Sequence, residues 1–267
     1  MTQDDRYQWI DTKAEQQIMD SLATIERDNT VKILFAIESG SRAWGFPSPD
    51  SDYDVRFVYV HPRDWYLSLN PGRDVIELPI EGDMDINGWD LKKALGLLLK
   101  PNPVLLEWLA SPIRYRWNDD ACAQLQTLAT QTTHGLACLH HYLNLGARQN
   151  KTYMERNTQV HLKKYFYSIR PAMAVRWLRL YPERPLPMSL SQFRKDLDLP
   201  DDLSTELDRL ITLKRRTREM GTGDRIAVID AFLKAEFDWA EGKVKNLKNT
   251  QPDLTAEAET LFRGQLT

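Results

Sequence analysis

The hydrophobic positions of this chain follow two different periods, and the change between them divides it into two regions. In the first part, short apolar runs bounded by Gly, Pro and Asp predict strands at 31–38, 54–60 and 74–80. Alternation of apolar and polar residues resumes at 84–86, which leaves open a hairpin or one bent strand with the preceding run. A helix-like spacing of apolar residues at 7–28 precedes all of these strands.

Helical periodicity dominates the rest of the chain. Apolar residues three and four positions apart predict helices over 89–99, 104–110, 119–150, 158–180, 203–219 and 225–247, with a short strand-like stretch at 113–117. Pro171 is expected to kink or divide its helix, because proline removes a backbone donor. Strands first and helices afterwards predict an α+β fold, with a mixed β-sheet and flanking helices followed by an α-helical domain.

Composition narrows the class of protein. No apolar run approaches the roughly 18–20 residues that span a bilayer, and the N-terminus is too polar and acidic for a signal or transit peptide. Two cysteines, Cys122 and Cys138, are too few for a disulfide framework, so we expect a reduced, cytoplasmic protein with no membrane partner. The net charge of −3 means that any nucleic-acid contact must come from a local basic patch.

The stretch IESGSRAWGFPSPDSDYDVRFVYV holds the most informative pattern. A Gly-Ser turn, Gly40-Ser41, follows one apolar strand, and Asp52 and Asp54 stand at the start of the next. Side chains alternate along a strand, so these two carboxylates are expected to share one face. Two carboxylates so close repel each other unless a cation lies between them, which suits Mg²⁺ or Mn²⁺.

The turn itself offers groups that bind anions. Gly40 permits close backbone approach, Ser41 supplies a hydroxyl and an N–H, and Arg42 follows directly, so all three are candidates for binding phosphate oxygens. Arg42 is equally suited to an ion pair with the acidic residues of the loop, and Glu38 could orient it. The combination implies a metal-bound substrate of the nucleoside triphosphate kind.

A third carboxylate is needed to orient a nucleophile. Asp85, in GDMDING, is the best candidate, and Asp83, on the same strand face, is the second. Two metal ions bound by Asp52, Asp54 and Asp85 could stabilise the attacking and the leaving oxygen together. A solvated turn rich in capping residues would explain the first two acids alone, whereas the turn and all three acids together favour a metal site.

At this point the chain resembles a known superfamily. Gly40-Ser41, ten intervening residues and Asp52-x-Asp54 between apolar strands resemble the signature of the polymerase-β-type nucleotidyltransferases. The strings DINGWDLKKAL, KPNPVLLEWLASPIRY and KKYFYSIRPAMAVRWL extend the resemblance to bacterial and phage predicted nucleotidyltransferases grouped with RNA-repair proteins, over roughly residues 30–235. The resemblance implies a nucleotidyltransferase-like mixed sheet with catalytic carboxylates on adjacent strands.

The resemblance also implies a domain organisation. We expect a catalytic domain at 1–118, a helical substrate-binding domain at 119–247, and a polar tail, open to flexibility, at 248–267. The implied reaction transfers a nucleoside monophosphate from an NTP, such as ATP, to an acceptor hydroxyl. An RNA end, 3′ or tRNA-like, is the first acceptor considered and a protein side chain the second. A non-catalytic nucleic-acid or partner-binding module with the same fold is the alternative.

The helix predicted at 158–180 carries Lys163, Lys164, Tyr167 and Arg170. The residues alone leave two interpretations open: basic and aromatic groups that hold phosphates and a base, or a half-exposed helix with its aromatic rings packed inward. The resemblance favours nucleotide binding by these four residues.

Two further clusters have simpler interpretations. The basic residues of 213–218 could contact an RNA backbone, but a solvated helix face is favoured. His134, Cys138 and His141 have a spacing that could bind zinc on one helix face, but a fourth ligand is not evident and Cys138 is interpreted as a core residue.

Overall fold

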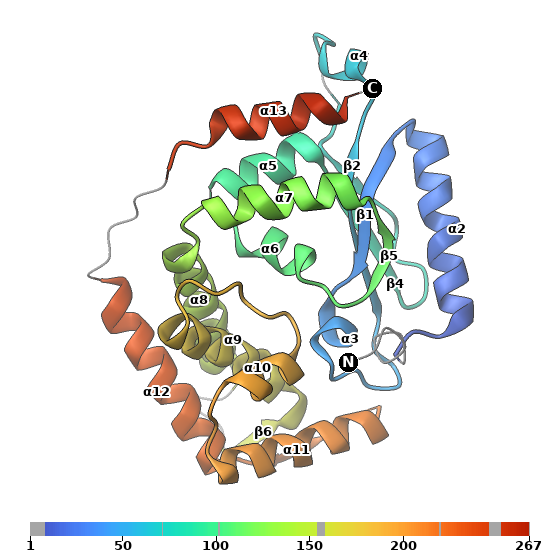
Figure 1. The fold of residues 1–267 in the computed structure, drawn as a ribbon. Helices are drawn as coiled ribbons and strands as arrows, with labels where there is room; N and C mark the ends of the chain where they lie inside the picture. Colours follow the sequence, from blue (N-terminus) through green and yellow to red (C-terminus); the bar gives the residue numbers. More distant parts are fainter. Residues whose placement is uncertain are drawn as a thin grey trace. The chain divides into compact units, whose positions relative to one another are not determined.

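The described residues of the chain fall into two units. Figure 1 shows the helices and strands in the order of the sequence. The computed structural model describes residues 9–70, 72–100, 102–153, 158–218, 220–245 and 252–266. Unit 1 comprises Met1–Trp44, Ser51–Thr133 and Gln251–Thr267, and unit 2 comprises Gly45–Asp50 and His134–Thr250. Unit 1 contains a mixed sheet with flanking helices and unit 2 is mainly helical, which confirms the predicted α+β class.

Unit 1 is built around a five-stranded sheet with the order β3-β4-β2-β1-β5. The strands are Lys32–Glu38 (β1), Tyr53–Val60 (β2), Val75–Glu77 (β3), Met84–Asp90 (β4) and Arg114–Trp117 (β5). β2 and β4 are parallel, and the other neighbouring pairs are antiparallel. β3 and β4 therefore form a hairpin, which decides the alternative that the sequence left open.

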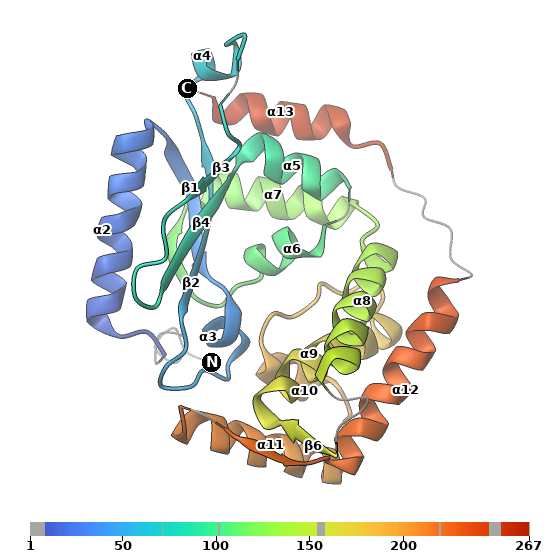
Figure 2. The same ribbon diagram turned by 180° about the vertical axis from the view of Figure 1, so that it is seen from behind.

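Helices cover both faces of this sheet, as Figures 1 and 2 show. One face packs against α2 (Thr12–Asn29), which contacts β1 and β5 and whose apolar stripe shares a buried cluster with side chains of β2. The other face packs against α5 (Leu91–Leu99), α6 (Pro103–Leu109), α7 (Asp119–Gln131) and α13 (Thr255–Gln265). Two short helices, α3 (Gly40–Trp44) and α4 (Arg63–Tyr66), precede and follow β2 along the chain.

Local sequence explains where α2 begins and ends. The Asp11 side chain accepts hydrogen bonds from the backbone N–H groups of Lys13 and Ala14, which satisfies donors that have no partner within the helix. The helix ends at Thr30, whose φ of +53° is left-handed and directs the chain into β1. This geometry presents Ile18 and Leu22, both fully buried, to the sheet.

Unit 2 is centred on three helices that pack on one another: α8 (Gly135–Tyr153), α9 (Leu162–Leu180) and α12 (Ala227–Val244). Two more, α10 (Leu190–Asp196) and α11 (Asp201–Arg216), pack on α9 and α12 respectively. A short antiparallel pair joins β6 (Gln159–His161) to β7 (Thr222–Asp224). Cys138 is buried in this unit, as its interpretation as a core residue required.

Several sequence-based boundaries were wrong. The helix predicted over 119–150 is two helices, because Thr132 adopts an extended conformation after α7 and α8 begins only at Gly135. The chain passes from unit 1 to unit 2 between residues 133 and 134, whereas the domain boundary was predicted at 118/119. Pro171 does not divide α9, which is continuous through it, and residues 159–161 form a strand where a helix was expected.

The predicted polar tail contains structure. Part of 248–267 lies outside the described residues, but α13 spans Thr255–Gln265 and belongs to unit 1. Ala258 and Leu261 are buried on this helix, which packs on α5 and α7. Among the described residues, no helix combines the length and the apolar character that crossing a bilayer requires.

The basic cluster 213–218 is not a uniformly solvated face, because Lys214 is only 1% exposed. Its Nζ lies 4.5 Å from the centre of the Phe46 ring and 5.2 Å from that of Phe166, and the two rings stack on each other. These cation–π contacts hold the segment Gly45–Asp50 within unit 2.

Burial of Lys214 also affects its protonation. Desolvation, followed by the charge of Lys163, lowers the pKa of Lys214 to about 8, and the charge of Asp50 opposes this. An unfolded lysine has an ordinary pKa of 10.5. Between these two values the unfolded chain binds more protons than the folded one, so this group makes the free energy of unfolding rise with pH.

Replacing Lys214 with Met should remove this pH dependence. We expect K214M to be more stable than the wild type near pH 7, by up to about 3 kcal/mol, and this advantage should shrink as the pH rises toward 10.5. Thermal unfolding between pH 7 and 10 measures the difference, with K243M at an exposed position of α12 as the matched control. A difference between K214M and wild type that stays constant over this range would contradict the assignment.

Candidate active site

Asp54 and Asp85 lie side by side at one end of the sheet. β2 and β4 are parallel, and their register pairs Asp54 with Asp85, so both side chains point to the same face. The guanidinium of Arg56 bridges them: its Nη2 lies 3.0 Å from Asp54 Oδ1 and 2.7 Å from Asp85 Oδ2. The two carboxyl side chains are 28% and 32% exposed, so they remain accessible to a ligand.

Asp52 lies directly before β2. β2 begins at Tyr53, so Asp52 is an exposed residue of the preceding loop, and its place on one face with Asp54 stays a prediction. Its backbone carbonyl accepts a hydrogen bond from Arg42 Nε at 3.2 Å. Its charge nevertheless acts on Asp54, whose pKa it helps to raise.

Asp83, the second candidate for the third carboxylate, does not pair with Asp54 as Asp85 does. It is an exposed residue of the turn before β4, and its backbone carbonyl accepts a hydrogen bond from the Tyr53 N–H at 2.7 Å. Within the described ranges, no group of three or more His, Cys, Asp or Glu side chains is arranged to hold a metal ion. The acids that the structure brings together are therefore Asp54 and Asp85.

The electrostatics of Asp54 reflect this crowding. Burial is the largest cause that raises the pKa of its carboxyl group, and the negative charges of Asp85 and Asp52 add to it. Arg56 is the largest influence in the opposite direction. The repulsion that the sequence predicts thus acts on Asp54, but the cation between the carboxylates in this structure is Arg56, so the clustering of acids does not by itself require a metal.

The Gly-Ser turn packs directly on the Asp54 side chain. Gly40 begins α3 with a φ of +55°, and a Cβ atom at this position would lie 1.8 Å from Asp54 Oδ2. The Ser39 N–H donates to the Asp54 carbonyl at 2.8 Å, which fixes the turn against the start of β2. The close backbone approach predicted at Gly40 is present, and the group that approaches is the catalytic candidate itself.

The other two residues of the turn differ from each other. Arg42 is buried, and its Nε, Nη1 and Nη2 donate to the backbone carbonyls of Asp52, Trp9 and Ser51 at 3.2, 2.5 and 2.6 Å. Its guanidinium also lies over the Tyr53 ring. These contacts indicate that Arg42 holds the loop before β2 through backbone carbonyls and not through an ion pair with the acidic residues of the loop. The phosphate contact predicted for Arg42 stays a prediction. Ser41 is half-buried on α3, and its role as a phosphate ligand stays a prediction.

Glu38, at the end of the neighbouring strand β1, supports Asp54. Its Oε1 accepts the Asp54 N–H at 3.0 Å, and its Oε2 accepts the Tyr115 hydroxyl at 2.6 Å. The Ser111 hydroxyl donates to the Glu38 carbonyl at 2.6 Å. Burial raises the pKa of Glu38 to about 7, against the lowering effect of the hydrogen bonds from the Tyr115 hydroxyl and the Asp54 N–H. Glu38 therefore fixes the backbone of Asp54, whereas the sequence predicted that it would orient Arg42.

The predicted nucleotide-binding residues of α9 belong to unit 2. Arg170 is buried, and its Nε donates to the Met188 carbonyl at 3.4 Å, which indicates a role in the core of that unit. Lys163, Lys164 and Tyr167 are half-buried, and Lys164 Nζ lies 5.4 Å from the centre of the Tyr167 ring. Their part in nucleotide binding stays a prediction.

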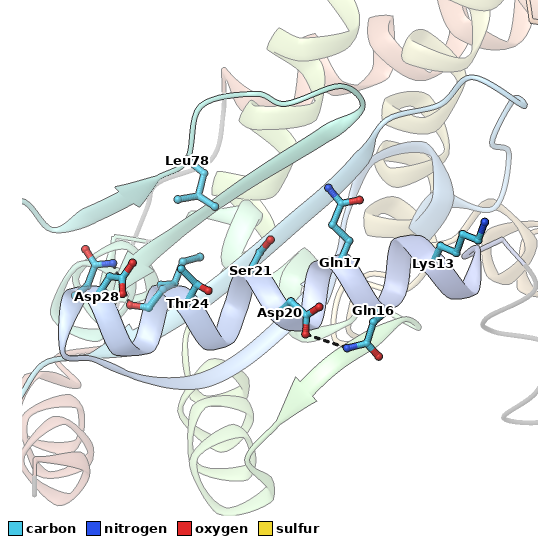
Figure 3. A pocket seen from close by; sticks show the side chains of 10 residues that line it. Lys13, Gln16, Gln17, Asp20, Ser21, Thr24, Asp28 and Leu78 are labelled. Atoms are coloured by element: carbon cyan, nitrogen blue, oxygen red, sulfur yellow. Dashed lines mark hydrogen bonds between the residues drawn. The ribbon is translucent and has the colours of Figure 1, made fainter.

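A surface groove of unit 1 lies away from these acids. It has a volume of about 480 Å³ and is formed mainly by α2, with Leu78 on its other side (Figure 3). Gln16 Nε2 donates to Asp20 Oδ1 at 2.9 Å across the outer surface of the helix. Its lining includes neither Asp54 nor Asp85, so we do not place the active site there.

Comparison with known proteins supplies the family. Residues 14–264 match the family described as the RNA repair pathway DNA polymerase beta family (RlaP), and the chain belongs to this family. This confirms the resemblance stated from the Gly-Ser turn and the acidic pair. A curated relative, the Bacillus subtilis (strain 168) protein YcgL, described as uncharacterized, is 42% identical over 248 residues, which cover 93% of this chain and 95% of the relative.

A solved structure shows a weaker likeness. The nucleotidyltransferase-like protein from Exiguobacterium sibiricum 255-15 is 14% identical, and the match covers 85% of this chain and 78% of that protein with a TM-score of 0.26.

Replacing Gly40 tests the packing of the turn on Asp54. G40A should lose about 1–2 kcal/mol of stability from the left-handed backbone and a further 1–3 kcal/mol, roughly, from the clash of its methyl group with the carboxylate. G82A is the matched control, because Gly82 has a similar φ of +63° but open space around its Cβ position. Thermal unfolding of both variants gives the comparison, and equal losses of stability would show that no clash occurs at Gly40.

Proposed function

We propose that this protein is a metal-dependent nucleotidyltransferase that transfers a nucleoside monophosphate from an NTP to an acceptor hydroxyl, with an RNA end as the acceptor. The observation that carries the proposal is the pairing of Asp54 with Asp85 on adjacent parallel strands, directly against the Gly-Ser turn. The chain belongs to a family described as the RNA repair pathway DNA polymerase beta family, and this membership supports both the reaction type and the acceptor.

The residues present fit a hard divalent cation. Asp54 and Asp85 offer partly exposed carboxylate oxygens, and Mg²⁺ and Mn²⁺ prefer one or two carboxylates together with water and substrate phosphates. Burial is the main cause that raises the pKa of Asp54, and the negative charges of Asp85 and Asp52 add to it. A bound cation would neutralise that charge and polarise the phosphoryl group of the substrate. Asp52, in the adjoining loop, would add charge to the same region.

The proposed reaction assigns separate tasks to the residues of unit 1. The acceptor oxygen attacks the α-phosphorus, a new P–O bond forms, and the bond to the β-phosphate breaks so that pyrophosphate leaves. Asp85 accepts the proton of the attacking hydroxyl, since it is a partly exposed carboxylate at the acidic pair. Glu38 and the Gly-Ser turn keep Asp54 in position through the backbone and through packing.

Asn substitutions test these assignments. D54N and D85N should lower nucleotide transfer at least about a hundredfold, because each removes a charge that the reacting phosphoryl group requires. D83N is the matched control and should retain activity, since Asp83 is exposed and contacts the site only through its backbone carbonyl. The assay incubates purified protein with each α-labelled triphosphate, Mg²⁺ or Mn²⁺, and either total RNA or total protein.

The same assay distinguishes the acceptors. Label in the RNA fraction supports the proposal, and label in protein would replace RNA by a protein side chain as the acceptor. If wild-type protein transfers no nucleotide to either, a non-catalytic binding role would replace the proposed reaction. Thermal unfolding of each variant separates a loss of activity from a loss of folding.

A further inference from the structure

Arg56 is fixed between the two acids by contacts from both of its terminal nitrogens. Nη2 forms the ion pairs with Asp54 and Asp85, and Nη1 donates to the carbonyls of Val55 and Asp85 at 3.0 and 2.8 Å. The side chain is 16% exposed, less than either carboxylate. One planar guanidinium thus connects β2 with β4 at the point where the acids meet, a geometry that a lysine ammonium cannot reproduce.

These contacts use ligand positions that a metal would need. One oxygen of each carboxylate is bound to Nη2, and a positive charge so close to both acids repels any further cation. A divalent ion that coordinates the pair must therefore compete with the guanidinium for oxygens and for charge.

We propose that Arg56 is the resident counter-ion of the Asp54–Asp85 pair, and that a divalent cation binds these carboxylates only by displacing it. This inference rests on the proposed function, because it takes the acidic pair to be the metal site. In the metal-free protein Arg56 keeps the two carboxylates together. Its affinity for them therefore sets the concentration of divalent cation at which the cation binds the pair. Displacement breaks two backbone hydrogen bonds as well as the ion pairs, so it raises that concentration further.

Metal binding without nucleotide tests the proposal directly. Isothermal titration with Mn²⁺ should give R56Q at least roughly tenfold tighter binding than wild type, because the competing charge is gone. R56K should bind with intermediate affinity, since its ammonium keeps the charge but lacks the guanidinium fork. R73Q is the matched control: it makes the same change of net charge at an ion pair with Glu77, where the Arg73 side chain is 76% exposed, and should bind like wild type.

Unfolding temperatures add a second readout. Without metal, R56Q should be less stable than wild type because the two acids lose their counter-ion, and saturating Mn²⁺ should raise its unfolding temperature more than that of wild type. If R56Q does not fold, R56K carries the same test, with Mn²⁺ affinity above that of wild type.

The outcomes separate the two proposals. If wild type binds Mn²⁺ and the Arg56 variants bind it equally or more weakly, the counter-ion role is overturned while the proposed function stands. If neither wild type nor the variants bind Mn²⁺, with or without a nucleoside triphosphate, both proposals are overturned.

Discussion

Parallel pairing of β2 with β4 is the constraint on which the candidate site depends. Its register places Asp54 beside Asp85 on one face of the sheet, which brings two like charges together in partly buried surroundings. Arg56, two residues further along β2, points to the same face and binds both acids. One short stretch of strand therefore supplies an acid of the pair and the cation that makes the pair tolerable.

The residues around the start of β2 hold Asp54 from several directions. Glu38 accepts its backbone N–H, the Ser39 N–H binds its carbonyl, and Gly40 leaves room for its carboxylate. Arg42 holds the loop that leads into the strand through three backbone carbonyls. A side chain fixed in this way is pre-organised, which lowers the entropic cost of placing a substrate against it. Much of the predicted phosphate-binding turn thus supports the acid itself.

How much of the fold and of the candidate site could be predicted from the sequence depends on how far apart along the chain the interacting residues lie. Apolar runs and turn residues locate β1, β2 and the Gly-Ser turn, because these signals are local. Predicting that Asp54 pairs with Asp85 requires knowing that β2 and β4 are parallel neighbours. No local sequence pattern contains this information. Arg56 had a usable signal, since residues two apart on a strand share a face, but its partners depend on that same long-range pairing.

The wrong boundaries have physical causes of the same kind. A helix over 119–150 was predicted because its apolar spacing continues across the break, whereas Thr132 is extended and lets the chain pass from unit 1 to unit 2. The tail was expected to be polar, yet Ala258 and Leu261 are three residues apart and pack α13 on α5 and α7. Lys214 was predicted to be solvated because the rings that bury it, Phe46 and Phe166, are distant from it in the sequence.

Anomalous X-ray scattering from crystals grown with Mn²⁺ and a non-hydrolysable nucleoside triphosphate would locate the cation relative to the acidic pair. We expect an Mn²⁺ peak coordinated by Asp54 and Asp85, with the Arg56 guanidinium moved away from at least one of them. An Mn²⁺ peak bound elsewhere in the protein, with Arg56 still bridging the two carboxylates, would contradict this expectation.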